Sequence, residues 1–223
     1  KKMGSFEYYH TSFSYLDNET GEEHFVGVPE QGGRDLISTD PLPPGEVYAS
    51  TVSAEGTVGL FRVEVSVANG SGKLKAAGGV SGATREALNR AFAYLQANKV
   101  DFGVGRELDC SDFNVEVLDL LGNHVEAEVG VAFFVAFFSA LRKAPAQPAI
   151  LVLGDMSIQG HLKRLRSLVE PLQIGKDNGA KKALIPIENK HDFLEVSGDI
   201  AEKVDPVFYG DPKTAAFKAL GLV

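Results

Sequence analysis

The chain has 223 residues, of which 44% are hydrophobic and 23% are charged, and it contains a single cysteine, Cys110. This composition excludes global disorder, a collagen-like chain and a disulfide scaffold, and one cysteine fits a reducing compartment. The net charge of −8 argues against a general nucleic-acid binder. No secretory signal is present, and the most apolar stretch, 129–141, is too short to cross a membrane. We therefore expect a cytoplasmic protein and, because the sequence does not begin with Met, part of a longer chain.

The first 44 residues differ in pattern from the rest. Two strand-like runs flank the turn sequence Asn-Glu-Thr-Gly at 18–21, which indicates a β-hairpin. A segment dense in Gly, Pro, Asp and Ser follows and is typical of a connector. We predict an N-terminal hairpin and connector over 1–44 and a second domain over 45–223.

Strands and helices follow one another through the second part. Asn69-Gly70 predicts a hairpin that joins a long alternating strand to a return strand beginning at Gly72. A helix that is apolar on every side, 129–141, must be covered all round. The chain order predicts an α+β fold that opens with an antiparallel meander. The remaining expected elements are strands at 47–53, 112–120, 148–154, 182–187 and 206–210, and helices beginning at Ser81, at the capping box Ser167–Glu170, at 188, at 197 and at Asp211-Pro212.

The sequence Asn-Gly-Ser-Gly-Lys-Leu at 69–74 has some features of a phosphate-binding loop. That motif needs Gly where Val67 stands and Ser or Thr where Leu74 stands, and it precedes a helix rather than a strand. We therefore predict a plain turn and no nucleotide cofactor in this chain.

Other candidate sites are weaker. His124, Glu126 and Glu128 alternate, so an extended backbone would place an imidazole and two carboxylates on one face, where they could hold a divalent metal. The alternative is a polar loop before a helix, with acids favoured near the helix N-terminus. Ser139 is expected to be a small core residue and Ser167 a helix cap.

The second part resembles the peptidase domain of Lon proteases. The family turn Gly-acid-hydrophobic-Thr-Leu-x-Gly corresponds to Gly-Asp-Met-Ser-Ile-Gln-Gly at 154–160. The family sequences Gly-x-Lys and Leu-Ile-Pro-x-x-Asn correspond to 179–181 and 184–189, without a gap. The resemblance covers about residues 45–220 and implies the Lon proteolytic fold, here preceded by a β-hairpin extension.

The resemblance also implies where a catalytic dyad would stand. Lon proteases cleave peptide bonds with a serine activated by a neutral lysine. The serine position is occupied here by Glu128 and the lysine position by Val169. We therefore expect a domain that has lost peptide hydrolysis.

The N-terminal segment and the C-terminal sequence Phe-Tyr-Gly-Asp-Pro at 208–212 are similar to the Lon-like proteins of BREX phage-defence systems. That similarity implies an upstream AAA+ ATPase, which would bind the ATP and Mg²⁺, a ring-shaped homo-oligomer such as a hexamer, and work on protein partners or DNA. No membrane contact is expected.

Two alternative functions remain. The first is a peptidase with a rearranged site, in which Ser139, Ser157 or Ser167 is the nucleophile and Lys163, four residues before Ser167, is the base. The second is DNA contact through the basic segment 161–182. A solvated face is the simpler interpretation of that segment. The six basic residues of that segment are Lys163, Arg164, Arg166, Lys176, Lys181 and Lys182.

Overall fold

A computed structural model describes residues 7–9, 12–16, 23–27, 35–78, 80 and 82–223. The chain divides into two units, residues 1–36 and residues 37–223. Each unit is described by itself below.

The first unit contains a three-stranded antiparallel sheet in the order β1-β2-β3. Its strands are β1 (Glu7–Tyr9), β2 (Ser12–Leu16) and β3 (Glu23–Gly27). The antiparallel pairing of β2 with β3 confirms the predicted hairpin, and β1 adds a third strand to it. The turn at 18–21 lies outside the described residues.

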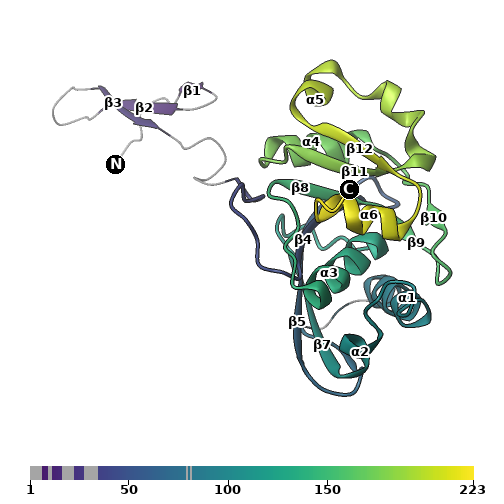
Figure 1. The fold of residues 1–223 in the computed structure, drawn as a ribbon. Coiled ribbons are helices and arrows are strands. Elements are labelled where there is room, and N and C mark those ends of the chain that lie inside the picture. The colour runs from purple at the N-terminus through teal and green to yellow at the C-terminus, as the bar shows by residue number, and fades with distance from the viewer. Residues whose placement is uncertain (1–6, 10–11, 17–22, 28–34, 79, 81) are drawn as a thin grey trace. The chain divides into compact units, whose positions relative to one another are not determined.

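The second unit is built on a seven-stranded sheet in the order β12-β11-β8-β4-β5-β7-β6 (Figure 1). The antiparallel pairs β4–β5 and β5–β7 form the meander, whereas β4–β8, β8–β11, β11–β12 and β6–β7 are parallel. This mixed sheet confirms the α+β class. The strands are β4 (Glu46–Val52), β5 (Val58–Asn69), β6 (Leu74–Ala76), β7 (Ser111–Asp119), β8 (Ile150–Leu153), β11 (Lys182–Pro186) and β12 (Asp205–Tyr209).

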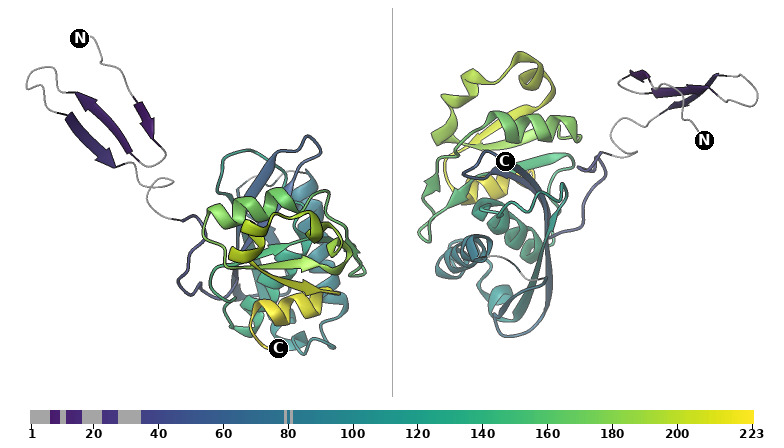
Figure 2. Two further views of the ribbon diagram at one scale, coloured as in Figure 1. Left: turned by 90° about the horizontal axis from the view of Figure 1, so that it is seen from above. Right: turned by 180° about the vertical axis from the view of Figure 1, so that it is seen from behind.

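Helices cover both faces of this sheet (Figures 1 and 2). On one face lie α1 (Gly82–Ala97), α3 (Gly130–Arg142) and α6 (Pro212–Ala219), and on the other lie α4 (Val169–Asp177) and α5 (Gly198–Lys203). A short ribbon of β9 (Asp155–Met156) and β10 (Leu162–Lys163) leaves the sheet after β8. The remaining short helices are α2 (Gly105–Asp109), η2 (Ile187–Asn189) and η3 (Asp192–Glu195). In the part of the chain that the structure describes, no helix is both long and apolar enough to cross a bilayer.

The centre of the larger core is α3, as its all-apolar sequence predicts. Every residue from Gly130 to Ser139 is buried. Phe137 packs edge-on against Phe113 of β7, and Phe134 packs against Phe102, with ring centroids 5.7 and 5.4 Å apart. Such aromatic pairs add to the stabilisation from burial of the rings, so this helix fixes the frame on which the groove described below is built.

The predicted hairpin at Asn69-Gly70 is wrong. The return strand, β6, does not pair with β5 but runs parallel to β7, which lies between them. The Asp112 carboxylate of β7 accepts the backbone N–H groups of Ser71 and Lys73 at 2.8 and 2.9 Å. The chain therefore turns around the start of β7 instead of folding back on β5.

Of the three predicted helix caps, Ser81 lies outside the described residues, and the other two differ in outcome. Asp211 caps α6 as expected, since its carboxylate accepts the Thr214 N–H at 2.8 Å and Pro212 occupies the first turn. The capping box at Ser167 is wrong, because α4 begins at Val169 and its N-cap is Leu168. The Ser167 hydroxyl instead donates to the Glu170 carboxylate, so neither side chain satisfies a backbone N–H of the helix.

Candidate functional site

A groove of about 630 Å³ lies where three loops meet. The loops are 51–57 between β4 and β5, 123–128 before α3, and 163–167 after β10. Seven residues named from the sequence line this groove. They are His124, Glu126, Glu128, Lys163, Arg164, Arg166 and Ser167.

Glu128 reaches the groove because the N-terminus of α3 is held against β9. The Gly130 N–H donates to Asp155 Oδ1 at 3.2 Å and the Val131 N–H donates to the Gly154 carbonyl at 3.3 Å. A Cβ at Gly130 would lie 2.4 Å from Asp155 Oδ1, so only glycine permits this approach. Glu128, two residues before, is half-buried at the start of the helix.

Asp155 is the buried charge of the site, and sequence reasoning missed it as a functional candidate. It is 5% exposed, and its Oδ2 is shared by Lys163 Nζ at 2.6 Å and Arg90 Nη2 at 2.9 Å. A buried carboxylate requires partners of this kind, because an unpaired one would remain poorly solvated. The available signal was an acid that is separated by one residue from a wholly apolar strand sequence, Ile150–Leu153. The ion pairs of Asp155 with Arg90 and Lys163 therefore join β9 to α1 and to β10 at the groove.

Val169 is placed differently from Glu128. It is the first residue of α4, is 37% exposed and is not among the residues that line the groove. Ser167, two residues earlier, does line it. The position that the resemblance to Lon proteases assigns to the lysine therefore carries a hydrocarbon side chain, which cannot accept a proton.

The three candidate serines are all engaged in local structure. Ser139 is fully buried, accepts the Gly45 N–H at 2.9 Å and donates to the Ala144 carbonyl at 2.6 Å, as expected for a core residue. Ser157 accepts backbone N–H groups within its own turn, and Ser167 is bonded to Glu170. Among the described residues, no hydrogen bond joins any of these hydroxyls to a lysine.

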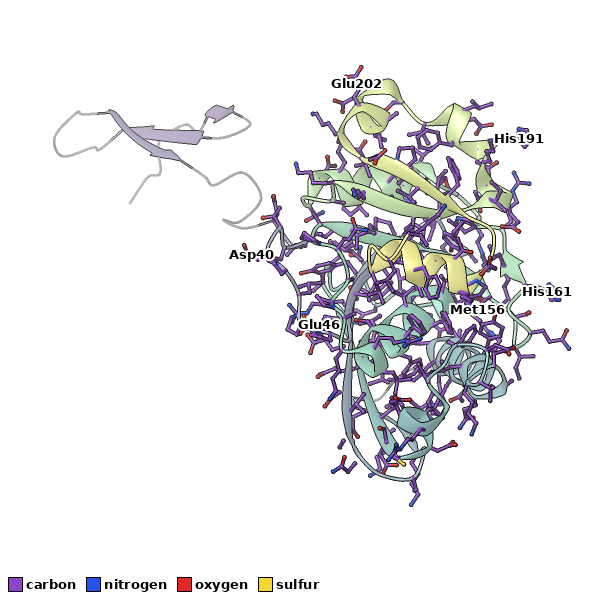
Figure 3. All side chains as sticks on the ribbon, viewed as in Figure 1. Asp40, Glu46, Met156, His161, His191 and Glu202 are labelled. Atoms are coloured by element: carbon purple, nitrogen blue, oxygen red, sulfur yellow. The ribbon has the colours of Figure 1, made fainter. Side chains whose placement is uncertain are left out.

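The turn that contains Ser157 projects from the fold, with Met156 on its inner side and His161 at its outer side (Figure 3). Gly160 in this turn has a φ of +85° and lies against the Tyr94 ring, where a Cβ would approach to 2.4 Å. The turn is thus seated on α1 and ends in Lys163, which faces the groove.

The backbone of the possible metal segment is not extended. His124 has a left-handed φ of +55°, and the Glu128 N–H donates to the Glu126 carbonyl at 3.0 Å. These local turns remove the alternation that would have placed the three side chains on one face. Within the described ranges, no group of three His, Cys, Asp or Glu side chains is arranged to hold a metal ion.

The loop at 69–74 does not fit a phosphate. Besides the two N–H groups bound by Asp112, the Gly70 and Gly72 N–H groups donate to backbone carbonyls at 2.9 Å. The two N–H donors on Asp112 hold its pKa below the usual range. The donors that would bind a phosphate are therefore already used by the protein itself.

Half of the six cations of the basic segment 161–182 form ion pairs within the fold. Arg164 pairs with Asp192, and Lys176 pairs with Asp199. Lys163 pairs with the buried carboxylate described above, and Lys182 Nζ lies 2.9 Å from the Gln147 side-chain oxygen.

Similarity to known proteins shows the family of this chain. The Lon protease (S16) C-terminal proteolytic domain matches residues 45–214, and the chain belongs to this family. Over its full length the chain is 34% identical to "Lon-like protease BrxL" of Escherichia coli O9:H4 (strain HS) and 34% identical to that of Bacillus cereus (strain H3081.97). A Lon protease of Brucella suis biovar 1 (strain 1330) is 26% identical over 66% of this chain. The chain spans about a third of the length of the BrxL relatives, 32% and 33%, and 18% of the Brucella protein.

Proposed function

We propose that this chain is the Lon-like domain of a BREX-type AAA+ protein and that it serves in oligomer assembly and partner contact without cleaving peptides. The observation that carries the proposal is the presence of Glu128 in the groove at the serine position, together with Val169 at the lysine position.

Amide hydrolysis by a Lon-type dyad needs a hydroxyl nucleophile and a neutral amine that takes its proton. The Glu128 carboxylate is a poor nucleophile towards an amide, and Val169 has no proton acceptor. The lysine that does face the groove, Lys163, is ion-paired with Asp155 and so is engaged as a cation. These three features favour a groove that binds without cutting.

The proposal extends to the rest of the protein through its relatives. A chain that spans a third of a BrxL protein leaves room for an AAA+ motor, which would bind the ATP and Mg²⁺. We propose that the whole protein is a cytoplasmic homo-oligomeric ring, hexameric as in the Lon family, and takes part in phage defence.

The first test is turnover of a fluorescently labelled unfolded protein by the full-length protein with ATP. We expect no cleavage by the parent and measurable cleavage by the Glu128→Ser/Val169→Lys variant. The single variants Glu128→Ser and Val169→Lys are the matched controls, because each supplies one half of a dyad and should stay inactive. Clear cleavage by the parent would refute the loss of activity.

One observation favours the rearranged peptidase as a second candidate, since Ser167 and Lys163 both line the groove. If cleavage by the parent is found, the Ser167→Ala variant should abolish it. Unchanged cleavage in that variant would remove Ser167 from the site.

A further inference from the structure

The groove has one wall on which the cations are already engaged. Lys163 shares the buried carboxylate of Asp155 with Arg90, and Arg164 is paired with Asp192 on η3 at the exterior. Ion pairing reduces the charge that Lys163 and Arg164 offer to a ligand, and the one carboxylate of Asp155 balances one of its two cations.

The remaining charged side chains that line the groove are three carboxylates and one cation, Arg166. Glu126 and Glu128 lie on the loop before α3, and Glu55 lies on the loop between β4 and β5. None of these three carboxylates forms an ion pair with a residue in the part of the chain that the structure describes. Hydrogen bonding to Ser53 lowers the pKa of Glu55, with a smaller effect from the charge of Arg166, so this carboxyl is ionised at neutral pH.

We propose that this groove binds an extended, lysine- or arginine-bearing segment of a partner protein. Two or more cationic side chains would meet the carboxylates, while hydroxyls of Thr51 and Thr57 in the same groove can bond to the segment's backbone. The inference rests on the proposed function, because a groove that does not cleave can hold such a segment as a partner.

Other ligands fit the groove less well. An apolar segment would bury the carboxylates of Glu55, Glu126 and Glu128 without providing partners for them, which is unfavourable. A nucleic acid would bring phosphates towards the same carboxylates and be repelled. The net charge of −8 on the whole chain acts in the same direction, since it steers cationic ligands towards the domain.

The test is fluorescence anisotropy with the full-length protein and a short labelled peptide of alternating lysine and serine. We expect binding that weakens with salt, and we expect the Glu126→Gln/Glu128→Gln variant to weaken it about tenfold at low salt. The matched control is Glu107→Gln/Glu116→Gln, which removes the same charge from two exposed positions outside this groove and should change the affinity less than about twofold.

Three results would overturn the proposal: equal weakening in both double variants, equal binding of a glutamate–serine peptide, or tighter binding of a short DNA duplex that competes with the lysine peptide. Incubation of the bound peptide with ATP separates this proposal from the preceding one. If the peptide binds and is then cleaved, the loss of peptidase activity is contradicted and the proposed ligand class stands. If the peptide neither binds nor is cleaved, only the proposed ligand class is overturned.

Discussion

At the scale of single residues, Gly154 is a position where the fold tolerates substitution poorly. It joins β8 to β9 with a φ of +123°, and a Cβ there would lie 2.3 Å from the Tyr209 hydroxyl and 2.9 Å from Pro186 Cγ. The Tyr209 ring cannot move aside, because it is fully buried and its hydroxyl donates to the Leu153 carbonyl. Burial raises the pKa of this phenol well above its usual range, so it remains a donor.

We expect Gly154→Ala to destabilise the domain by about 2–4 kcal/mol, because it combines an unfavourable φ with overpacking. Urea unfolding followed by circular dichroism measures this change. Gly210→Ala is the control, since a Cβ at Gly210 meets nothing within 4 Å and should alter stability by less than about 0.5 kcal/mol. Equal stability of the two variants would contradict the packing around Gly154.

The site residues differ in how far the sequence could predict them. Glu128 was predictable because the family pattern fixes its place before a strongly apolar helix. Asp155 appears in the same family turn, yet its role depends on Arg90 of α1, 65 residues away in sequence. A pairing that is made only when α1 packs beside β9 leaves no local pattern, so it could be found only from the fold.

At the scale of elements, the antiparallel meander carries a row of like charges. Glu46 of β4, Glu64 of β5 and Glu116 of β7 are direct neighbours in register across three strands. Directly opposed like charges destabilise a sheet, and Arg62 compensates only part of this row, with its Nε 2.6 Å from Glu64. Burial, followed by the charge of Glu64, raises the pKa of Glu46 above 4.5, while Arg62 lowers it.

The sign of the resulting pH dependence follows from that raised pKa. The folded state binds the Glu46 proton more tightly than the unfolded state does, so this contribution is present below pH 4.5 and is lost as pH rises through the folded pKa. We expect Glu46→Gln to raise Tm by about 1–2 °C at pH 7, a modest gain because the carboxyl is only half-buried and solvent screens part of its charge. Tm should be unchanged at pH 4, where the raised pKa keeps this carboxyl largely protonated. A Tm gain of the same size at both pH values would mean that charge is not the cause.

The elements themselves were predictable where the signal is local. The apolar run of α3 and the Asp211-Pro212 start of α6 are both confirmed. The strand β6 was assigned to the wrong partner, because Asn69-Gly70 favours a hairpin and the competing contacts come from Asp112, about forty residues later. In this case a long-range carboxylate determined the path of the turn.

At the scale of the whole molecule, the remaining question is whether the basic segment 161–182 contacts DNA. Three of its six cations form ion pairs and Lys182 donates to the side-chain oxygen of Gln147, which leaves Arg166 and Lys181 without an ion pair or a side-chain hydrogen bond among the described residues. If both contacted phosphates, their removal would reduce the salt dependence of DNA binding by about 0.9 log units per contact. We expect the Arg166→Gln/Lys181→Gln variant of the full-length protein to keep the parent's slope of log affinity against log salt, measured by duplex titration. A slope lowered by nearly 2 would instead assign DNA contact to this face, and the surrounding carboxylates would then have to be screened by the rest of the assembly.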